Sequence, residues 1–184
     1  MEYYNNYSWG CNYMQPIQPQ NPYGRPADPY TYPQNFPMAL QLIRDAVSGE
    51  MEDRLFYSYL ISVAPSQEDK EIIASIRDDE MKHFDLFRQI YFQLTGQILP
   101  QPREGEFTKP ATYCQGLKQA LLGELAAVQR YRRILFAMQD RRHINMLTEI
   151  ITDEIRHANL YNLLYSKNGC YAEELEGKKN KTNV

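Results

Sequence analysis

One spacing occurs twice in this chain and constrains its fold more than any other feature. A lone glutamate stands 30 residues ahead of a Glu-x-x-His pair, and the same arrangement returns 74 residues later. The residues are Glu50, Glu80 and His83 in the first copy and Glu124, Glu154 and His157 in the second. Four carboxylates and two imidazoles at this spacing are the ligands of a di-iron or di-manganese site inside a four-helix bundle.

These six residues lie on apolar stripes of helical period. From Met38 onward, apolar side chains recur every three or four residues through four segments, which predicts four amphipathic helices. Pro65 ends the first segment and Ser66 can cap the second, which closes at Gly96. Because all six candidates belong to the apolar stripes, we expect their side chains to point into the core.

The connection between the second and third segments is long. Residues 97–112 contain three prolines and a glycine and are not expected to be helical. Fully extended, about 16 residues reach roughly 50 Å, whereas a helix of about 29 residues is roughly 43 Å long. An ordinary antiparallel turn needs only about two to eight residues. The sequence therefore predicts two antiparallel helical hairpins joined by one crossover that runs the length of the bundle.

The hairpin turns place the candidate ligands at one height. In an antiparallel hairpin, residues equidistant from the turn lie opposite each other. The midpoint between Glu50 and Glu80 is Pro65, and the midpoint of the second pair of glutamates is residue 139, beside a polar turn. Glu and His at i and i+3 also project from the same side of one helix. Each lone glutamate should therefore face its own Glu-x-x-His pair.

Charge supports the metal interpretation. A buried ion carries a penalty of several kcal/mol even after relaxation, and four buried glutamates would hold four negative charges. Two divalent cations cancel that charge. The four stripes have no matching set of lysines or arginines at their central positions to neutralise the glutamates. Arg54, near Glu50, is the one basic residue that could compensate part of this charge.

Two further pairs surround the predicted ligands. Asp79 and Asp153 each precede a ligand glutamate and point roughly 100° away from it. Since a ligating histidine normally donates its second N–H to a carboxylate, our hypothesis is that Asp79 serves His157 and Asp153 serves His83, the alternative being surface charge. Tyr57 and Tyr131, two turns beyond the lone glutamates, either pack in the core or contact a ligand.

The remaining histidine and the cysteines have simpler interpretations. His143 has no glutamate at ligand spacing and is predicted to be a surface residue. The cysteines Cys11, Cys114 and Cys170 form an odd, scattered set without a C-x-x-C motif, which argues against a disulfide framework. We therefore expect reduced thiols and a cytoplasmic location.

Composition divides the chain into three parts. Residues 1–37 are rich in Tyr, Pro and Asn and predict an extended or disordered arm, which is either a linker or a contact for a partner or assembly. Residues 38–168 form the bundle, and 169–184 a short C-terminal tail. A net charge of −3 and a pI near 5.7 do not indicate a nucleic-acid partner. Neither a signal peptide nor a membrane span is predicted.

Residues 38–166 resemble the ferritin-like superfamily and, within it, the helical domain of rubrerythrins. The matching motifs are Gly49-Glu50-x-x-x-Arg54-x-x-Tyr57-x-Tyr59, Asp79-Glu80-x-x-His83, Gly123-Glu124 and Asp153-Glu154-x-x-His157. The resemblance implies an all-α, ferritin-like four-helix bundle with a non-haem di-iron centre that reacts with H2O2 or O2. By the same analogy, Glu80 and Glu124 bridge the metals, Glu50 and Glu154 are terminal ligands, and each histidine binds one metal.

The chain departs from rubrerythrins at two points. Ala127 stands where they usually carry an extra glutamate, and no four-cysteine, rubredoxin-type iron motif is present. A peroxidase of this kind would then need an external electron donor. The alternatives are two Mn ions or a mixed pair in a catalase-like enzyme, a ferroxidase, and a non-catalytic iron-handling or structural component of an assembly. A homodimer is the expected oligomer.

Overall fold

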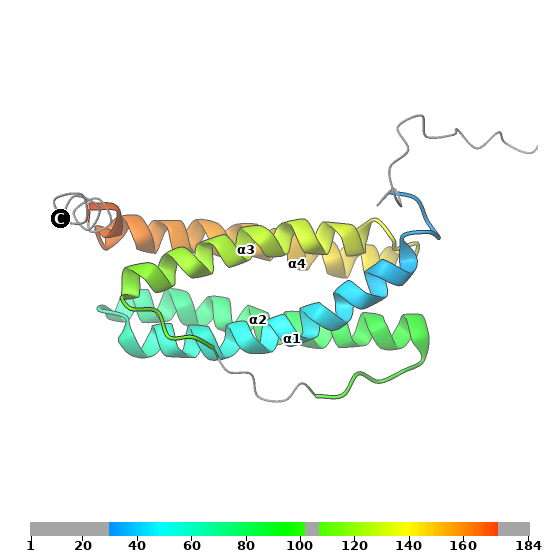
Figure 1. The fold of residues 1–184 in the computed structure, drawn as a ribbon, viewed down its shortest axis with the longest axis horizontal. Helices are drawn as coiled ribbons and strands as arrows, with labels where there is room; N and C mark the ends of the chain where they lie inside the picture. Colours follow the sequence, from blue (N-terminus) through cyan, green and yellow to red (C-terminus); the bar gives the residue numbers. More distant parts are fainter. Residues whose placement is uncertain (1–29, 102–106, 173–184) are drawn as a thin grey trace, which may run out of the picture.

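The computed structural model describes residues 30–101 and 107–172, and these residues form a four-helix bundle (Figure 1). The helices are α1 (Phe36–Val63), α2 (Gln67–Thr95), α3 (Tyr113–Leu135) and α4 (Arg141–Lys167). The described part of the chain contains no strand. The all-α, ferritin-like bundle that the sequence predicts is confirmed. Most of the predicted arm, residues 1–29, and most of the predicted tail, residues 173–184, lie outside the described residues.

The helices end where capping residues stand in the sequence. The Ser66 side chain accepts a hydrogen bond from the Asp69 backbone N–H at the start of α2, and Gly96 closes that helix with a φ of 71°. Thr112 and Asp140 cap α3 and α4 in the same way. Side-chain oxygens thus satisfy N–H groups that the first turn of a helix leaves without partners.

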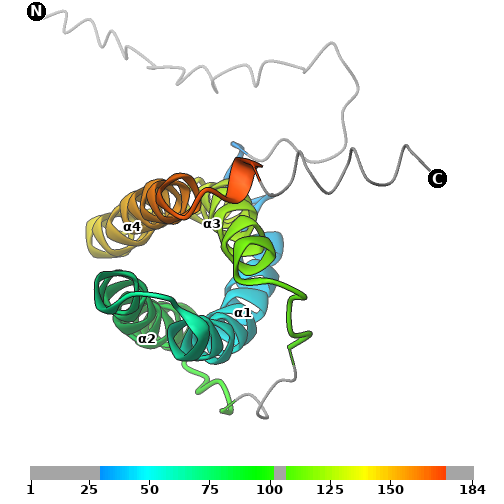
Figure 2. The ribbon, with the colours of Figure 1, turned by 90° about the vertical axis from the view of Figure 1, so that its left-hand side faces the viewer.

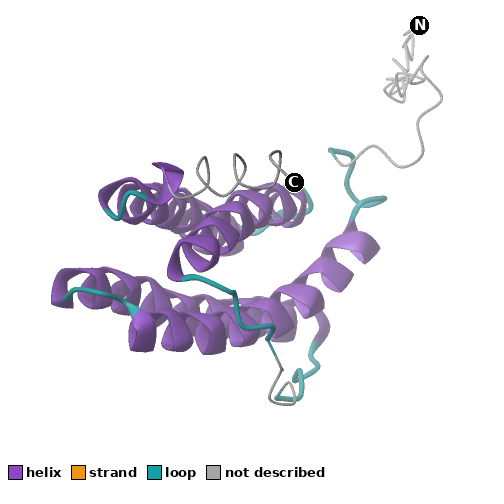
Figure 3. Cartoon of the chain, turned by 60° about the vertical axis from the view of Figure 1, so that its left-hand side comes forward, coloured by secondary structure: helices purple, strands orange, loops and turns teal. Residues whose placement is uncertain are grey.

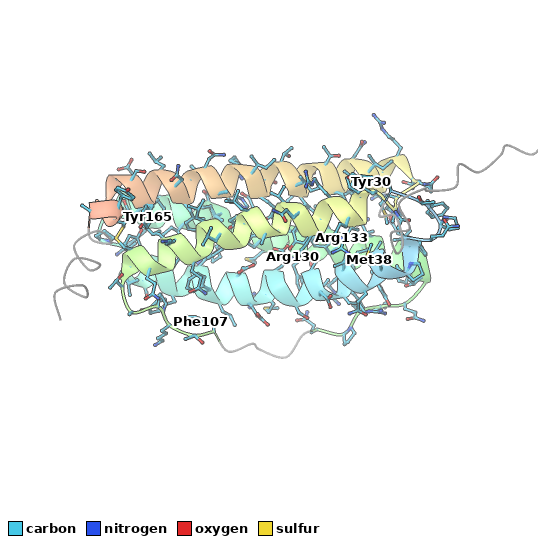
Figure 4. The ribbon with its side chains drawn as sticks, turned by 45° about the horizontal axis from the view of Figure 1, so that its top comes forward. Tyr30, Met38, Phe107, Arg130, Arg133 and Tyr165 are labelled. Carbon is cyan, nitrogen blue, oxygen red and sulfur yellow. A yellow bond between two sulfur atoms is a disulfide. The ribbon has the colours of Figure 1, made fainter. Side chains whose placement is uncertain are left out.

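The first helix begins two residues before the predicted Met38. Asn35, which is buried, donates from Nδ2 to the backbone oxygen of Phe136 at 3.1 Å. The ring of Tyr30, labelled in Figure 4, packs on the Phe136 ring with centroids 4.7 Å apart. Contacts with the α3–α4 turn therefore order the chain from Tyr30 onward, inside the segment predicted to be an arm.

The crossover gives the bundle its connectivity. Its described parts, residues 97–101 and 107–112, lie on the outside of the bundle, and α3 starts at the end of the bundle where α2 also starts (Figures 1 and 3). Viewed along the axis, α1 lies beside α2 and α3, and α4 completes the ring next to α2 and α3 (Figure 2). Phe107 anchors the crossover on α1, with its ring 5.7 Å from that of Phe56 and 5.5 Å from that of Tyr59.

Two apolar clusters fill the two ends of the bundle. One contains Phe87, Ile90, Tyr131, Ile134 and Leu147, and the other contains Tyr57, Leu60, Ile73, Tyr161 and Leu164. Between them lies a buried polar layer of six residues: Glu50, Glu80, His83, Glu124, Glu154 and His157. The candidate site is therefore enclosed by apolar packing at both ends.

His143 corrects one prediction. Its side chain is only 6% exposed, and Nε2 lies 2.8 Å from Gln93 Oε1 at the end of α2. In the repeat its counterpart is Asp69, also buried, which accepts hydrogen bonds from Lys167 and Asn168 at the end of α4. Both residues therefore connect the start of one helix to the end of another. The spacing of the candidate ligands in the sequence does not reveal this role.

The cysteines correct a second prediction. Cys114, at the start of α3, forms a disulfide with Cys170, just beyond α4, across 56 residues of sequence. The bond lies near Tyr165 at one end of the bundle (Figure 4). The predicted reduced thiols are therefore wrong for this pair. Scattered cysteines far apart in sequence gave no sign that the antiparallel α3–α4 hairpin brings these two within a Cα–Cα distance of 5.2 Å.

Two glycines of α3 provide a matched test of this packing. A Cβ at Gly116 would lie 2.6 Å from Leu60 Cδ2 and 3.0 Å from Pro110 Cγ, whereas a Cβ at Gly123 would contact nothing within 4 Å. We expect Gly116→Ala to lower the free energy of unfolding by about 1–2 kcal/mol through overpacking. Gly123→Ala should raise it by about 0.5–1 kcal/mol through helix propensity. Urea denaturation followed by circular dichroism measures both, and equal effects would contradict the close α1–α3 approach.

Candidate metal centre

The structure brings all six predicted ligands together. They form two overlapping groups whose ligand atoms all lie within 4.8 Å of one another. One group consists of Glu50, Glu80, His83 and Glu154, and the other of Glu80, Glu124, Glu154 and His157. All six residues are at most 2% exposed.

Each histidine turns one nitrogen toward the carboxylates. His83 Nδ1 lies 3.1 Å from Glu80 Oε2 and 3.0 Å from Glu154 Oε1. His157 Nδ1 lies 3.0 Å from Glu80 Oε1 and 3.7 Å from Glu124 Oε2. The two rings stack with centroids 5.8 Å apart. Both imidazoles therefore present an Nδ1 atom to the same set of carboxylate oxygens.

Several of these buried atoms have no hydrogen bond despite their close neighbours. Glu80 Oε1, Glu154 Oε1 and His157 Nδ1 make none with acceptable geometry within the described residues. A buried polar atom left without a partner costs about 1–3 kcal/mol, and here three of them converge on one place. Hard oxygen and imidazole donors arranged in this way fit a pair of divalent transition-metal ions.

Sharing of the carboxylates differs from the arrangement that the resemblance implied. Glu80 and Glu154 belong to both groups, whereas Glu50 and Glu124 each belong to one. Glu80 and Glu154 would therefore bridge, and Glu124 would be terminal, the reverse of the expected roles of Glu124 and Glu154. The reason is the repeat itself, because its pseudo-two-fold relation makes the Glu-x-x-His glutamates of α2 and α4 equivalent.

The second nitrogen of each histidine faces an aspartate of the other hairpin. His83 Nε2 lies 3.3 Å from Asp153 Oδ2, and His157 Nε2 lies 3.2 Å from Asp79 Oδ2. This is the cross-bundle pairing of aspartates with histidines that our hypothesis proposed. An Nε2–H that donates to the aspartate leaves the Nδ1 lone pair directed at the carboxylates, as a metal ligand requires.

Two tyrosines hydrogen-bond to the lone glutamates across the bundle. Tyr57 on α1 donates to Glu124 Oε1 on α3 at 2.6 Å, and Tyr131 on α3 donates to Glu50 Oε1 on α1 at 2.6 Å. Of the two alternatives left open by the sequence, the structure shows contact with a candidate ligand. Because each tyrosine also belongs to one of the apolar clusters, the clusters hold the lone glutamates in place.

Sequence reasoning missed two charged residues near the site. Arg156, between the last two candidate ligands, forms ion pairs with both Asp79 and Asp153. Asp53, one turn beyond Glu50, is close enough for the charges of Glu50 and Glu124 to affect its pKa, which burial raises well above the usual range. The repeat could have identified Asp53, because it relates Asp53 to Ala127, the position at which the chain departs from the family it resembles.

Without metal, the cluster compensates its charge by taking up protons. Burial raises the pKa of Glu50 and of Glu154 well above the usual range, and the neighbouring Glu80 charge adds to this effect. Burial disfavours the charged form of His157, but the Glu124 and Glu80 carboxylates outweigh it and raise the pKa of His157 to about 10. Metal ions and protons therefore compete for the same atoms.

A cavity of about 190 Å³ between α1, α2 and the crossover reaches the cluster from outside. Glu50 and Glu80 line it on the inside, with Met51, Met81 and Phe84 as apolar walls. Arg54, Asp85 and Gln101 supply its other polar groups. A small molecule in this cavity would touch one lone glutamate and one of the two shared glutamates.

Fold and site together define a ferritin-like four-helix bundle with a buried carboxylate–histidine cluster suited to two metal ions. The sequence matches the rubrerythrin family over residues 41–165, and the chain belongs to that family. The uncharacterized protein YhjR of Bacillus subtilis is 29% identical over 133 residues, which cover 70% of this chain and 90% of YhjR.

One solved structure shares the fold. The crystal structure of a conserved hypothetical protein from Mycobacterium tuberculosis covers 72% of this chain and 93% of its own, with a TM-score of 0.63 and 12% sequence identity. At this identity the likeness concerns the fold alone. Among the described helices, none combines the length and the apolar character needed to cross a membrane.

The pKa of His157 predicts how the metal-free protein responds to pH. A raised folded-state pKa contributes stability that is complete below the unfolded value of about 6.5 and is lost as the pH rises toward about 10. The raised pKa values of Glu50 and Glu154 act in the same direction. We expect the melting temperature of metal-free protein to fall between pH 6.5 and 10. Metal-loaded protein, in which the ions replace these protons, should show a much smaller fall in calorimetry, and parallel curves would contradict this account.

The aspartate contact of His83 has its own test. Asp153→Ala should weaken metal binding by about 10–100-fold, because the imidazole loses the group that fixes its orientation and tautomer. Competition with a chromophoric chelator measures the affinity. Asp78→Ala, which removes an exposed carboxylate paired with Arg77, is the matched control and should leave the affinity unchanged. Equal affinities in the two variants would show that Asp153 does not support the ligand.

Proposed function

We propose that the protein is a di-iron oxidoreductase that reduces H2O2 or O2. The observation that carries this proposal is the pair of buried ligand groups joined through Glu80 and Glu154, with a cavity that opens onto one of them. Two ions held this close can act on one small oxidant together. Bound iron would supply reversible cycling between Fe(II) and Fe(III).

The donor set supports a redox-active metal. Four carboxylates and two imidazoles favour hard ions of the iron and manganese kind over soft ones. The hydrogen bonds from Tyr57 and Tyr131 and the cross-bundle aspartates leave the two lone glutamates and the two imidazoles little freedom to move. A rigid shell keeps both metal positions in place when their charge changes.

The cavity supports a small oxidant as substrate. Its volume accommodates O2 or H2O2 together with water, and its lining combines the apolar side chains of Met51, Met81 and Phe84 with five polar or charged ones. The approach passes Arg54 and ends at Glu50 and Glu80. The repeat places Val128 where Arg54 stands, so this polar approach belongs to the first hairpin and is not a general feature of both.

A manganese catalase is the second candidate, because the same oxygen-rich donor set suits manganese. A catalase needs no electron donor, since it converts two H2O2 molecules to O2 and water. A ferroxidase differs in its substrate, which is Fe(II) itself.

One reaction separates the di-iron peroxidase from the manganese catalase. Protein with an intact Cys114–Cys170 disulfide and a loaded metal site in the divalent state is mixed with H2O2 under anaerobic conditions, and both peroxide loss and O2 release are recorded. A di-iron peroxidase should consume about one H2O2 per pair of ferrous ions, with ferric absorption appearing and no O2 released. Continuous O2 release from a manganese-loaded sample would favour the catalase, and unreacted peroxide with either metal would overturn both. Glu80→Ala, which removes a shared ligand, should abolish the reaction.

A further inference from the structure

We propose that Cys114 and Cys170 are the immediate electron donor for peroxide reduction, and that Tyr161 and Tyr57 connect them to the metal centre. The proposal rests on the function proposed above and names the reductant that this function requires.

The two cysteines differ in the way expected of an exchanging pair. Cys114 is half-buried in the first turn of α3, where the positive end of a 23-residue helix stabilises a thiolate. Cys170 is 1% exposed and packed against the second apolar cluster. Cys114 is therefore the more accessible of the two to an outside dithiol, while Cys170 is protected. The disulfide itself shows that the folded chain brings both sulfurs to bonding distance.

Two tyrosines link the apolar cluster that contains Cys170 to a candidate ligand. Tyr161 and Tyr57 belong to the same apolar cluster as Cys170, and their ring centroids are 5.3 Å apart. Tyr57 then donates its hydrogen bond to Glu124. Cys114 and Glu124 are ten residues apart on α3, which is about 15 Å along the helix axis. The two phenol rings provide intermediate groups over this distance.

The Tyr161 hydroxyl is an unfavourable group at its buried position, and apolar packing does not account for it. It is fully buried and makes no hydrogen bond of acceptable geometry with any described residue, although the centroids of the Tyr161 and Tyr57 rings are 5.3 Å apart. A buried hydroxyl without a hydrogen-bond partner destabilises the folded state. The repeat supplies the comparison, because its counterpart Phe87 packs on Tyr131 at 4.8 Å without a hydroxyl. Only the half of the repeat that faces the disulfide carries the second phenol.

The reaction balances as H2O2 plus two cysteine thiols giving one disulfide and two water molecules. The O–O bond breaks and the Cys114–Cys170 S–S bond forms. Each sulfur loses one electron, and the two thiol protons complete the two waters. An external dithiol then restores the pair by exchange at Cys114 and leaves as its own disulfide.

The test counts thiols rather than turnover. In a Cys11→Ser background, reduced and metal-loaded protein receives one equivalent of H2O2 without air. Acid and an alkylating reagent stop the reaction, and mass spectrometry counts free thiols while a separate assay follows peroxide. We expect one Cys114–Cys170 disulfide per H2O2. Tyr161→Phe, with unchanged metal content, should form it at least tenfold more slowly. Tyr91→Phe, the buried tyrosine at the opposite end of the bundle, should match the parent.

Three results would overturn the proposal. The thiols could remain reduced while the metal-loaded protein consumes peroxide, which would leave the proposed function intact and remove the cysteines from it. The disulfide could form equally fast in chelator-treated protein, which would make it a direct reaction of the thiols. Peroxide could remain unconsumed by the metal-loaded parent, and this result, read from the peroxide assay alone, would overturn the proposed function and the donor role together.

Discussion

The fold depends on one electrostatic constraint, the burial of four carboxylates in a single layer of the bundle. Glu50, Glu80, Glu124 and Glu154 each come from a different helix, and each is at most 2% exposed. Their mutual repulsion would separate the two hairpins unless protons or metal ions cancel it. The aspartates behind the histidines, the tyrosines on the lone glutamates and the apolar clusters at both ends all serve to hold this layer in register.

Much of this arrangement could be predicted from the sequence because it follows from spacing. The repeated Glu-x-x-His motif predicted which helices carry the candidate ligands, the midpoints at Pro65 and residue 139 predicted their heights, and the length of the crossover predicted the connectivity. The cross-bundle aspartates followed from general rules for metal-bound histidine. Each of these arguments uses only local geometry or symmetry, and the structure has the same helices and the same cluster.

The rest depends on contacts between segments that share no local pattern. The Cys114–Cys170 disulfide forms because the start of α3 meets the end of α4, and no spacing rule connects positions 56 residues apart. His143 is buried because Gln93 lies opposite it. Distances between helices are needed to see that Glu80 and Glu154 belong to both ligand groups. The family analogy instead implied that Glu80 and Glu124 are the shared ligands. Differences within the repeat, such as Tyr161 in one copy and Phe87 in the other, could not be interpreted until the surroundings of each ring were known.

The central claim is that Glu80 and Glu154 would hold two metal ions jointly while Glu50 and Glu124 would hold one each. Elemental analysis of purified protein and its alanine variants tests it most directly. The account predicts two ions per chain in the parent, about one in Glu50→Ala and in Glu124→Ala, and almost none in Glu154→Ala, with all variants folded by circular dichroism. A parent that binds no transition metal, or a Glu154→Ala variant that keeps both ions, would contradict it.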